Sequence, residues 1–146
     1  PGSTRSFMPE QADIARAIVL NRGEVLILQN SEEDEKGYAR GRWESPGGFV
    51  EEHDEHEREA LHREIQEETG LDVEVERKLE RIAVTIDGDT SDCQYYLARS
   101  GSRDVELSDE HQDHRWIDPG EARSVDWYYY STYMIPVLER LEENLD

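Results

Sequence analysis

Three glutamates in one short segment have the spacing of a metal site. Glu64, Glu67 and Glu68 stand at positions i, i+3 and i+4, so a helix would gather their carboxylates on about one quadrant of its surface. Like charges placed in this way repel each other unless a cation lies between them, and carboxylate oxygens suit Mg²⁺ or Mn²⁺. In so acidic a chain, a solvated acidic helix is the alternative interpretation of the same spacing.

A glycine pair precedes this segment. Gly47 and Gly48 follow Pro46, and neither carries a side chain that would keep a ligand away from the backbone. The pair therefore marks a place where main-chain atoms can approach a metal or a phosphate closely.

The stretch from the glycine pair onward resembles the Nudix box. That pattern reads Gly, five residues, Glu, seven residues, then Arg-Glu-aliphatic-any-Glu-Glu-any-Gly-aliphatic. The segment from Arg63 to Leu71 matches every defined position, and Glu55 stands at the expected distance before Arg63. Six residues separate Gly48 from Glu55, one more than in the usual box. An insertion is most easily absorbed in the turn before the helix, so either Asp54 or Glu55 takes the position of the first glutamate.

The resemblance implies an α/β fold, an α/β/α sandwich with a mixed sheet and a loop-helix-loop catalytic motif. It also implies a magnesium-dependent enzyme, with Mn²⁺ as a substitute. In the family, the helix glutamates bind the metal, the glycine carbonyl often joins them, and the arginine pairs with the first glutamate. Carried over, these roles imply Glu67, Glu68, Glu64 and Gly48 as metal ligands, Glu64 also as a candidate base, and Arg63 with Glu55 as a structural pair.

A second acidic patch lies downstream at Glu110-His111, followed by Arg115-Trp116. Its simplest interpretation is a polar loop that enters a strand. The sequence of this patch also resembles a segment found after the box in many Nudix hydrolases, where the loop glutamate contacts metal or activates water. Glu110 is therefore a second candidate for the general base, and the choice between Glu64 and Glu110 stays open.

The implied reaction is hydrolysis of the phosphoric anhydride bond in a nucleoside diphosphate linked to another group. Its substrate is a small nucleotide, and the box does not select the attached group. The segment Leu107–Ile117, together with Tyr95–Ala98, is particularly similar to diadenosine tetraphosphate hydrolases. A nucleoside triphosphate pyrophosphatase is a further alternative, as is a hydrolase of nucleotide sugars. A non-catalytic nucleotide sensor is less favoured, because such proteins usually lose box glutamates that are all present here.

The elements that must position these residues can be read from hydrophobic patterning and turn residues. Two hairpins, a helix between them and a closing helix predict a mixed sheet with helices on its faces. The predicted strands are Ile14–Leu20, Val25–Gln29, a short extended segment within Trp43–Val50, Val73–Ile86, Gln94–Ala98 and Arg115–Ile117. The predicted helices are His56–Thr69, Pro119–Val125 and Tyr133–Leu145.

Aromatic residues gather near the C-terminus, where Trp127 to Tyr130 are followed by Tyr133. Such a cluster could stack a nucleobase. Alternate residues of the run would face inward, so packing of the final helix on the sheet is the preferred interpretation. Trp43 is equally consistent with a core position and with a pocket wall.

The length of 146 residues fits one domain. Residues 8–146 are expected to form a single Nudix domain, and residues 1–7, before Met8, are expected to be an expression remnant or a disordered start. No apolar run reaches the roughly 18 residues of a membrane span, so a cytoplasmic protein without a membrane partner is expected. The oligomeric state is left open, with a homodimer as one alternative. Cys93 is the only cysteine, which excludes an internal disulfide.

Acidic residues outnumber basic ones by 36 to 16, for a formal net charge of −20. Such a field repels nucleic-acid phosphates, so no broad nucleic-acid-binding surface is expected. Only Lys36 and Lys78 are lysines. This composition is consistent either with a halophilic protein, whose self-repulsion is screened by salt, or with an ordinary acidic protein.

Overall fold

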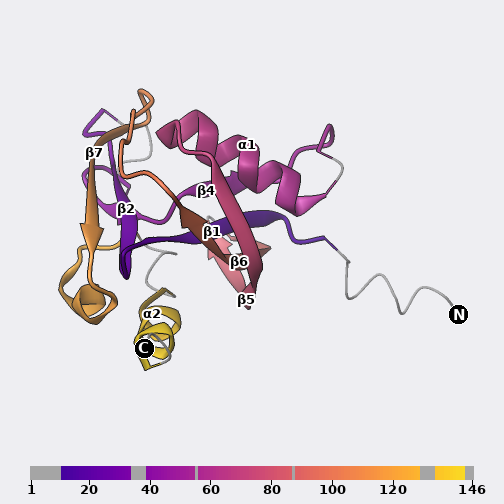
Figure 1. Ribbon diagram of the computed structural model, residues 1–146. Coiled ribbons are helices and arrows are strands. Elements are labelled where there is room, and N and C mark those ends of the chain that lie inside the picture. Colours follow the sequence, from indigo (N-terminus) through magenta and orange to yellow (C-terminus); the bar gives the residue numbers. More distant parts are fainter. Residues whose placement is uncertain (1–10, 34–38, 55, 87, 129–133, 144–146) are drawn as a thin grey trace, which may run out of the picture.

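A mixed β-sheet lies between two α-helices in the computed structural model, which describes residues 11–33, 39–54, 56–86, 88–128 and 134–143 (Figure 1). The helices lie on opposite faces of the sheet, as the α/β/α prediction requires. The elements are β1 (Ile14–Asn21), β2 (Glu24–Asn30), β3 (Trp43–Glu44), β4 (Gly47–Phe49), α1 (Glu57–Thr69), β5 (Val73–Ile86), β6 (Asp89–Ser100), β7 (His111–Ile117), the 3₁₀ helix η2 (Pro119–Ser124) and α2 (Met134–Glu143).

Strand β1 is the centre of the sheet, whose order is β3-β2-β1-β6-β5, with β4 paired to β1 and β7 paired to β2. Along one edge β1 runs parallel to β6, whereas the other pairs of named strands are antiparallel. Along the opposite edge β1 changes partner: Leu20 and Asn21 pair with β2, whereas Ile14 to Arg16 pair with β4. This change of partner brings the glycine pair of β4 against the central strand.

Two separate hydrophobic cores cover the two faces of the sheet, because successive residues of a strand point to opposite faces. The core beneath α1 includes Ala15, Ala17, Val19, Leu26, Leu28, Leu61, Ile65 and Tyr96. The core beneath α2 includes Ile14, Ile18, Leu20, Val25, Ile27, Tyr95, Val137 and Leu138. Between these apolar neighbours, Arg16 faces the same side of β1 as Ile14 and Ile18.

Helix α1 has well-defined ends. His56 is its N-cap, and the Nδ1 atom of His56 accepts a hydrogen bond from the backbone N–H of Arg58 at 3.2 Å. Gly70 ends the helix in the left-handed conformation, with φ of 73°, and its N–H donates to the Gln66 carbonyl. The predicted helix and its glycine C-cap are therefore confirmed.

Both predicted hairpins and both downstream helical segments are also present. Strand β6 begins at Asp89, five residues earlier than predicted, and β7 begins at His111, four residues earlier. Both extensions run through mostly polar residues, which show no apolar pattern, and both are held by pairing with a neighbouring strand, β5 or β2. Residues 1–7 and Tyr133 lie outside the described residues. Among the described residues, no helix is long and apolar enough to cross a membrane.

Candidate active site

A cavity of about 240 Å³ lies where α1 approaches β3 and β4. Three of the carboxylates expected in the site line it: Glu64 and Glu68 from α1, and Glu110 from the turn before β7. Glu44 and Glu51 line it as well. The fold therefore brings together acidic residues that are far apart in the sequence.

Glu68 is the most deeply buried of the expected ligands, with 5% of its surface exposed. One of its oxygens accepts a hydrogen bond from the Gly47 N–H at 3.0 Å. Burial, together with the nearby charge of Glu44, raises the pKa of Glu68 well above its ordinary value. A buried carboxylate of this kind gains most from a neighbouring cation.

Glu64 is partly buried beside Gly48. A Cβ atom on Gly48 would lie 2.3 Å from a carboxylate oxygen of Glu64, so any larger residue would displace the Glu64 carboxylate from this position. Burial raises the pKa of Glu64, and the charges of Glu67 and Glu110 add to the rise, although Arg63 opposes it. The effect of Glu110 on Glu64 indicates that the loop acid and the helix acids share one electrostatic environment.

The donor set fits a divalent cation. Glu68, Glu110 and His111 each offer a ligand atom, and these atoms all lie within 4.8 Å of one another. Most of the donors around the cavity are carboxylate oxygens, the hard ligands that Mg²⁺ and Mn²⁺ prefer. Among the described lining residues Arg16 is the one cation, so a polyphosphate needs metal ions to offset the acidic charge.

Arg63 holds the turn before α1 to the helix. Its Nε and Nη2 atoms donate to the two carboxylate oxygens of Asp54 at 3.2 and 2.9 Å, and Arg63 holds the pKa of Asp54 below its usual range. Glu55, the partner expected from the box, lies outside the described residues. With Asp54 in the position of the first glutamate, five residues separate it from Gly48, as in the usual box. The extra residue then falls between Asp54 and the helix.

Glu67 lies apart from the other expected ligands. Its side chain is 60% exposed and accepts a hydrogen bond from Arg63 Nη1 at 3.2 Å. It does not belong to the lining of the cavity. Its role as a metal ligand therefore stays a prediction.

A buried ionic cluster beside Glu68 was not found from the sequence. Glu44 accepts a hydrogen bond from His111 Nε2 at 2.8 Å and lies 3.7 Å from Arg16 Nη2. Desolvation would raise the pKa of Glu44, but Arg16 and His111 outweigh it and the pKa is lowered. Arg16 also donates to the Ser45 carbonyl at 2.6 Å. The one available signal was an arginine inside the apolar run of β1.

The described part of the C-terminal aromatic cluster packs in the core, as preferred from the sequence. Trp127 and Tyr128 are each 4% exposed, and Trp127 Nε1 donates to the Ala122 carbonyl at 2.8 Å. Trp43 is partly buried, with the Arg115 guanidinium 5.6 Å from its ring centre. Phe49, which no sequence motif marks as functional, is 55% exposed and lines the cavity.

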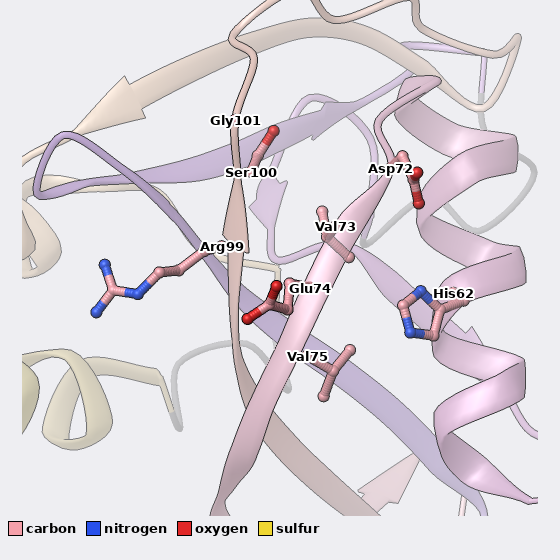
Figure 2. A pocket seen from close by; sticks show the side chains of 8 residues that line it. All are labelled: His62, Asp72, Val73, Glu74, Val75, Arg99, Ser100 and Gly101. Atoms are coloured by element: carbon pink, nitrogen blue, oxygen red, sulfur yellow. The ribbon is translucent and has the colours of Figure 1, made fainter.

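A larger and more open hollow, of about 710 Å³, lies between α1 and the β5–β6 edge. Figure 2 shows His62 of α1 facing Val73 and Val75 of β5, whereas Arg99 of β6 extends to the other side of the strands. None of the expected catalytic or metal-binding residues lines it. The smaller, acidic cavity is therefore the better candidate for the chemistry.

Comparison with known proteins agrees with this geometry. The NUDIX domain family model matches residues 11–136. Nucleoside triphosphatase NudI of Salmonella typhimurium is 32% identical over 127 residues, which cover 80% of this chain and 88% of that protein.

Solved structures with a similar fold agree with this family match. A MutT protein from Methanosarcina mazei superimposes with a TM-score of 0.74 at 25% identity, covering 94% of this chain and 99% of that one. An Ap4A hydrolase from C. elegans, at 22% identity and a TM-score of 0.71, covers 92% and 99% and shares the fold. With the box helix, the acidic cavity and a family match over most of its length, the chain belongs to the Nudix hydrolase family.

Proposed function

We propose that this enzyme hydrolyses nucleoside triphosphates to a nucleoside monophosphate and pyrophosphate, using Mg²⁺ or Mn²⁺. The observation that carries the proposal is the acidic cavity in which Glu64, Glu68 and Glu110 come together. The triphosphate class is supported by the NudI relatives, which are named nucleoside triphosphatases.

Glu68 would hold the metal, together with whichever of Glu64 and Glu110 does not accept the proton of the attacking water. A bound divalent cation neutralises phosphate charge and lowers the pKa of a water molecule. Arg63 keeps the turn before α1 in place through Asp54, and Gly47 and Gly48 let the backbone of β4 lie against the helix carboxylates. These contacts orient the acids before substrate binds.

In the hydrolytic step, the water oxygen forms a bond to the α-phosphorus. The bond from the α-phosphorus to the oxygen that bridges to the β-phosphate breaks, and pyrophosphate leaves. The proton of that water passes to a carboxylate. Glu110 is the preferred acceptor because it is exposed at the cavity, whereas Glu68 is buried. Glu64 is the alternative acceptor.

Dinucleoside polyphosphates are the second candidate substrates, on the strength of the resemblance around Tyr95–Ala98 and Glu110–Ile117. Tyr95 and Tyr96 are fully buried in the two cores. They do not reach a substrate from there, so this part of the resemblance concerns packing. The triphosphate therefore remains the first candidate.

The test is a parallel assay of nucleoside triphosphates, diadenosine tetraphosphate, ADP-ribose and nucleotide sugars, with products separated by anion exchange. We expect the highest kcat/KM with a triphosphate, complete loss of activity in chelator, and recovery with Mg²⁺ or Mn²⁺. Full activity after exhaustive chelation would contradict the metal-dependent mechanism. A higher kcat/KM for diadenosine tetraphosphate would replace the first candidate with the second.

A further inference from the structure

Phe49 is the one large hydrophobic side chain that is exposed among the described residues, at 55%. Isolated exposed hydrophobics are common and need no function by themselves. The position of Phe49 is different, because it directly follows Gly48 and lines the cavity that holds Glu64 and Glu68. An apolar ring therefore stands beside the acidic residues of the proposed reaction.

The cavity lining combines two chemistries. Its carboxylates suit a metal-bound polyphosphate, whereas Ala39, Phe49 and Tyr128 supply apolar and aromatic surface. Tyr128 is buried and presents little surface, so Phe49 offers the larger accessible ring. A ligand that matches both parts carries phosphates at one end and a flat aromatic group at the other.

The backbone of Phe49 is held firmly. Phe49 is paired with Ile14 across β4 and β1, and the next residue, Val50, donates its N–H to the Asp13 carbonyl at 2.8 Å. A ring on a fixed strand end can be presented to a ligand with little ordering of the backbone. This arrangement suits a stacking surface better than a side chain on an unpaired loop would.

We propose that Phe49 stacks against the nucleobase of the substrate, an inference that rests on the proposed function and specifies how the nucleoside is held. A phenyl ring has no hydrogen-bonding group, and every base has a π-face, so this contact binds bases with little discrimination among them. Phe49 is then a determinant of affinity for nucleotides over phosphate chains that lack a base.

The first test measures binding of a 2-aminopurine nucleoside triphosphate analogue whose phosphate bridges are methylene groups, in the presence of Mg²⁺. Stacking quenches 2-aminopurine fluorescence, so we expect quenching with the wild-type enzyme. Phe49→Ala should weaken binding roughly 5- to 150-fold, the range expected for one base–aromatic stack, and should lose the quenching. Phe49→Trp should retain both.

His62→Ala is the matched control, because His62 places an exposed ring in the other hollow, between α1 and β5 (Figure 2). It should bind and quench like the wild type. Loss of quenching in His62→Ala, with none in Phe49→Ala, would place the base in that other hollow and overturn the proposal. Absence of analogue binding by the wild type would also overturn it.

The second test separates base binding from chemistry. Phe49→Ala should raise KM for a nucleoside triphosphate with little change in kcat, and should leave hydrolysis of inorganic tripolyphosphate, which has no base, unchanged. Equal losses with both substrates would show that Phe49 supports the acidic site and does not stack. A wild type that binds and quenches the analogue but hydrolyses no triphosphate would refute the proposed function and leave the stacking contact standing.

Discussion

Glu68 lies where a carboxylate is costly to keep ionised. It is 5% exposed, close to the charge of Glu44, and held by the Gly47 N–H. Burial and like charge both favour its protonated form. A divalent cation reverses that preference, because it stabilises the ionised carboxylate directly.

Replacing Glu68 with Gln should lower kcat by roughly 100-fold or more, because it removes one negative charge from the proposed metal site while keeping side-chain volume. Circular dichroism and Mn²⁺ titration monitored by electron paramagnetic resonance should show a native fold with weaker metal binding. Wild-type turnover in this variant would remove Glu68 from the metal site.

Glu110→Gln should act on rate more than on substrate binding. If Glu110 accepts the proton of the attacking water, kcat should fall roughly 10- to 1,000-fold, with a smaller change in KM and an altered pH–rate profile. An unchanged rate and pH profile would make Glu64 the preferred base.

At the scale of elements, the turn between β4 and α1 carries the inserted residue. Asp54 makes the two-pronged contact with Arg63, and its second oxygen also accepts the Glu51 N–H at 2.8 Å. Because Asp54 is bonded both to the helix and to the start of the turn, a residue inserted after Asp54 need not move the glycine pair.

Asp54→Asn should therefore impair the enzyme more than Glu55→Gln, lowering both kcat and the melting temperature. The reason is that the neutral amide loses the charge-assisted bonds to Arg63. Differential scanning calorimetry and steady-state kinetics on the two variants decide which acid occupies the first acidic position of the box. A larger loss in Glu55→Gln would restore the pairing expected from the sequence.

Glu57 ties the first turn of α1 to its neighbours. It accepts hydrogen bonds from the Tyr96 hydroxyl and from the Ala12 N–H, the latter at 2.7 Å, and lies 3.7 Å from Lys78 Nζ. Desolvation raises the pKa of Glu57, but the bonds and the nearby cations outweigh it and the pKa is lowered. A lowered pKa in the folded protein adds stability above the unfolded value and loses it as pH falls through the folded value.

The wild type should be more stable than Glu57→Gln at neutral pH by roughly 1 to 3 kcal/mol, since the variant loses bonds to a charged acceptor. That difference should shrink as pH falls below about 4.5, where the unfolded chain takes up the proton first. Urea unfolding between pH 3 and 7 provides the measurement. A difference that is constant across this range would exclude the linkage.

Sequence patterning predicted the elements well where apolar residues repeat, as in β1, α1 and the β5–β6 hairpin. The helix spacing of Glu64 and Glu68 likewise follows from local geometry. The Arg16–Glu44–His111 cluster could not be predicted in this way, because its members come from three strands and only the sheet pairing brings them together. The same applies to Phe49, whose exposure depends on where β4 ends.

For the whole molecule, with its net charge of −20, added salt has two opposing effects on the stability of the fold. Surface ion pairs such as Arg99–Glu76 and Arg123–Glu139 contribute about 0 to 1 kcal/mol each, and salt weakens them. Salt also screens the repulsion among the excess carboxylates, which stabilises the fold, and this repulsion involves many more charges than the ion pairs do. The second effect should prevail.

The melting temperature should therefore rise between low and molar potassium chloride at constant pH. Scanning calorimetry across that series is the measurement. A less acidic variant, with several exposed glutamates changed to glutamine, is the control and should respond less. A flat or falling series would mean that the acidic composition is not an adaptation to salt.

The parallel pairing of β1 with β6 has a consequence for how the enzyme is made. It joins residues about 80 positions apart in the chain, and β1 is also the strand against which the glycine pair of β4 lies. Contacts so distant in sequence form late, because closing a long loop lowers the chain entropy before the new contacts stabilise the structure. We therefore expect nascent chains that end before β6 to contain the complete box and yet lack a working site. Catalytic competence should arrive only after β6 has been made and has paired with β1.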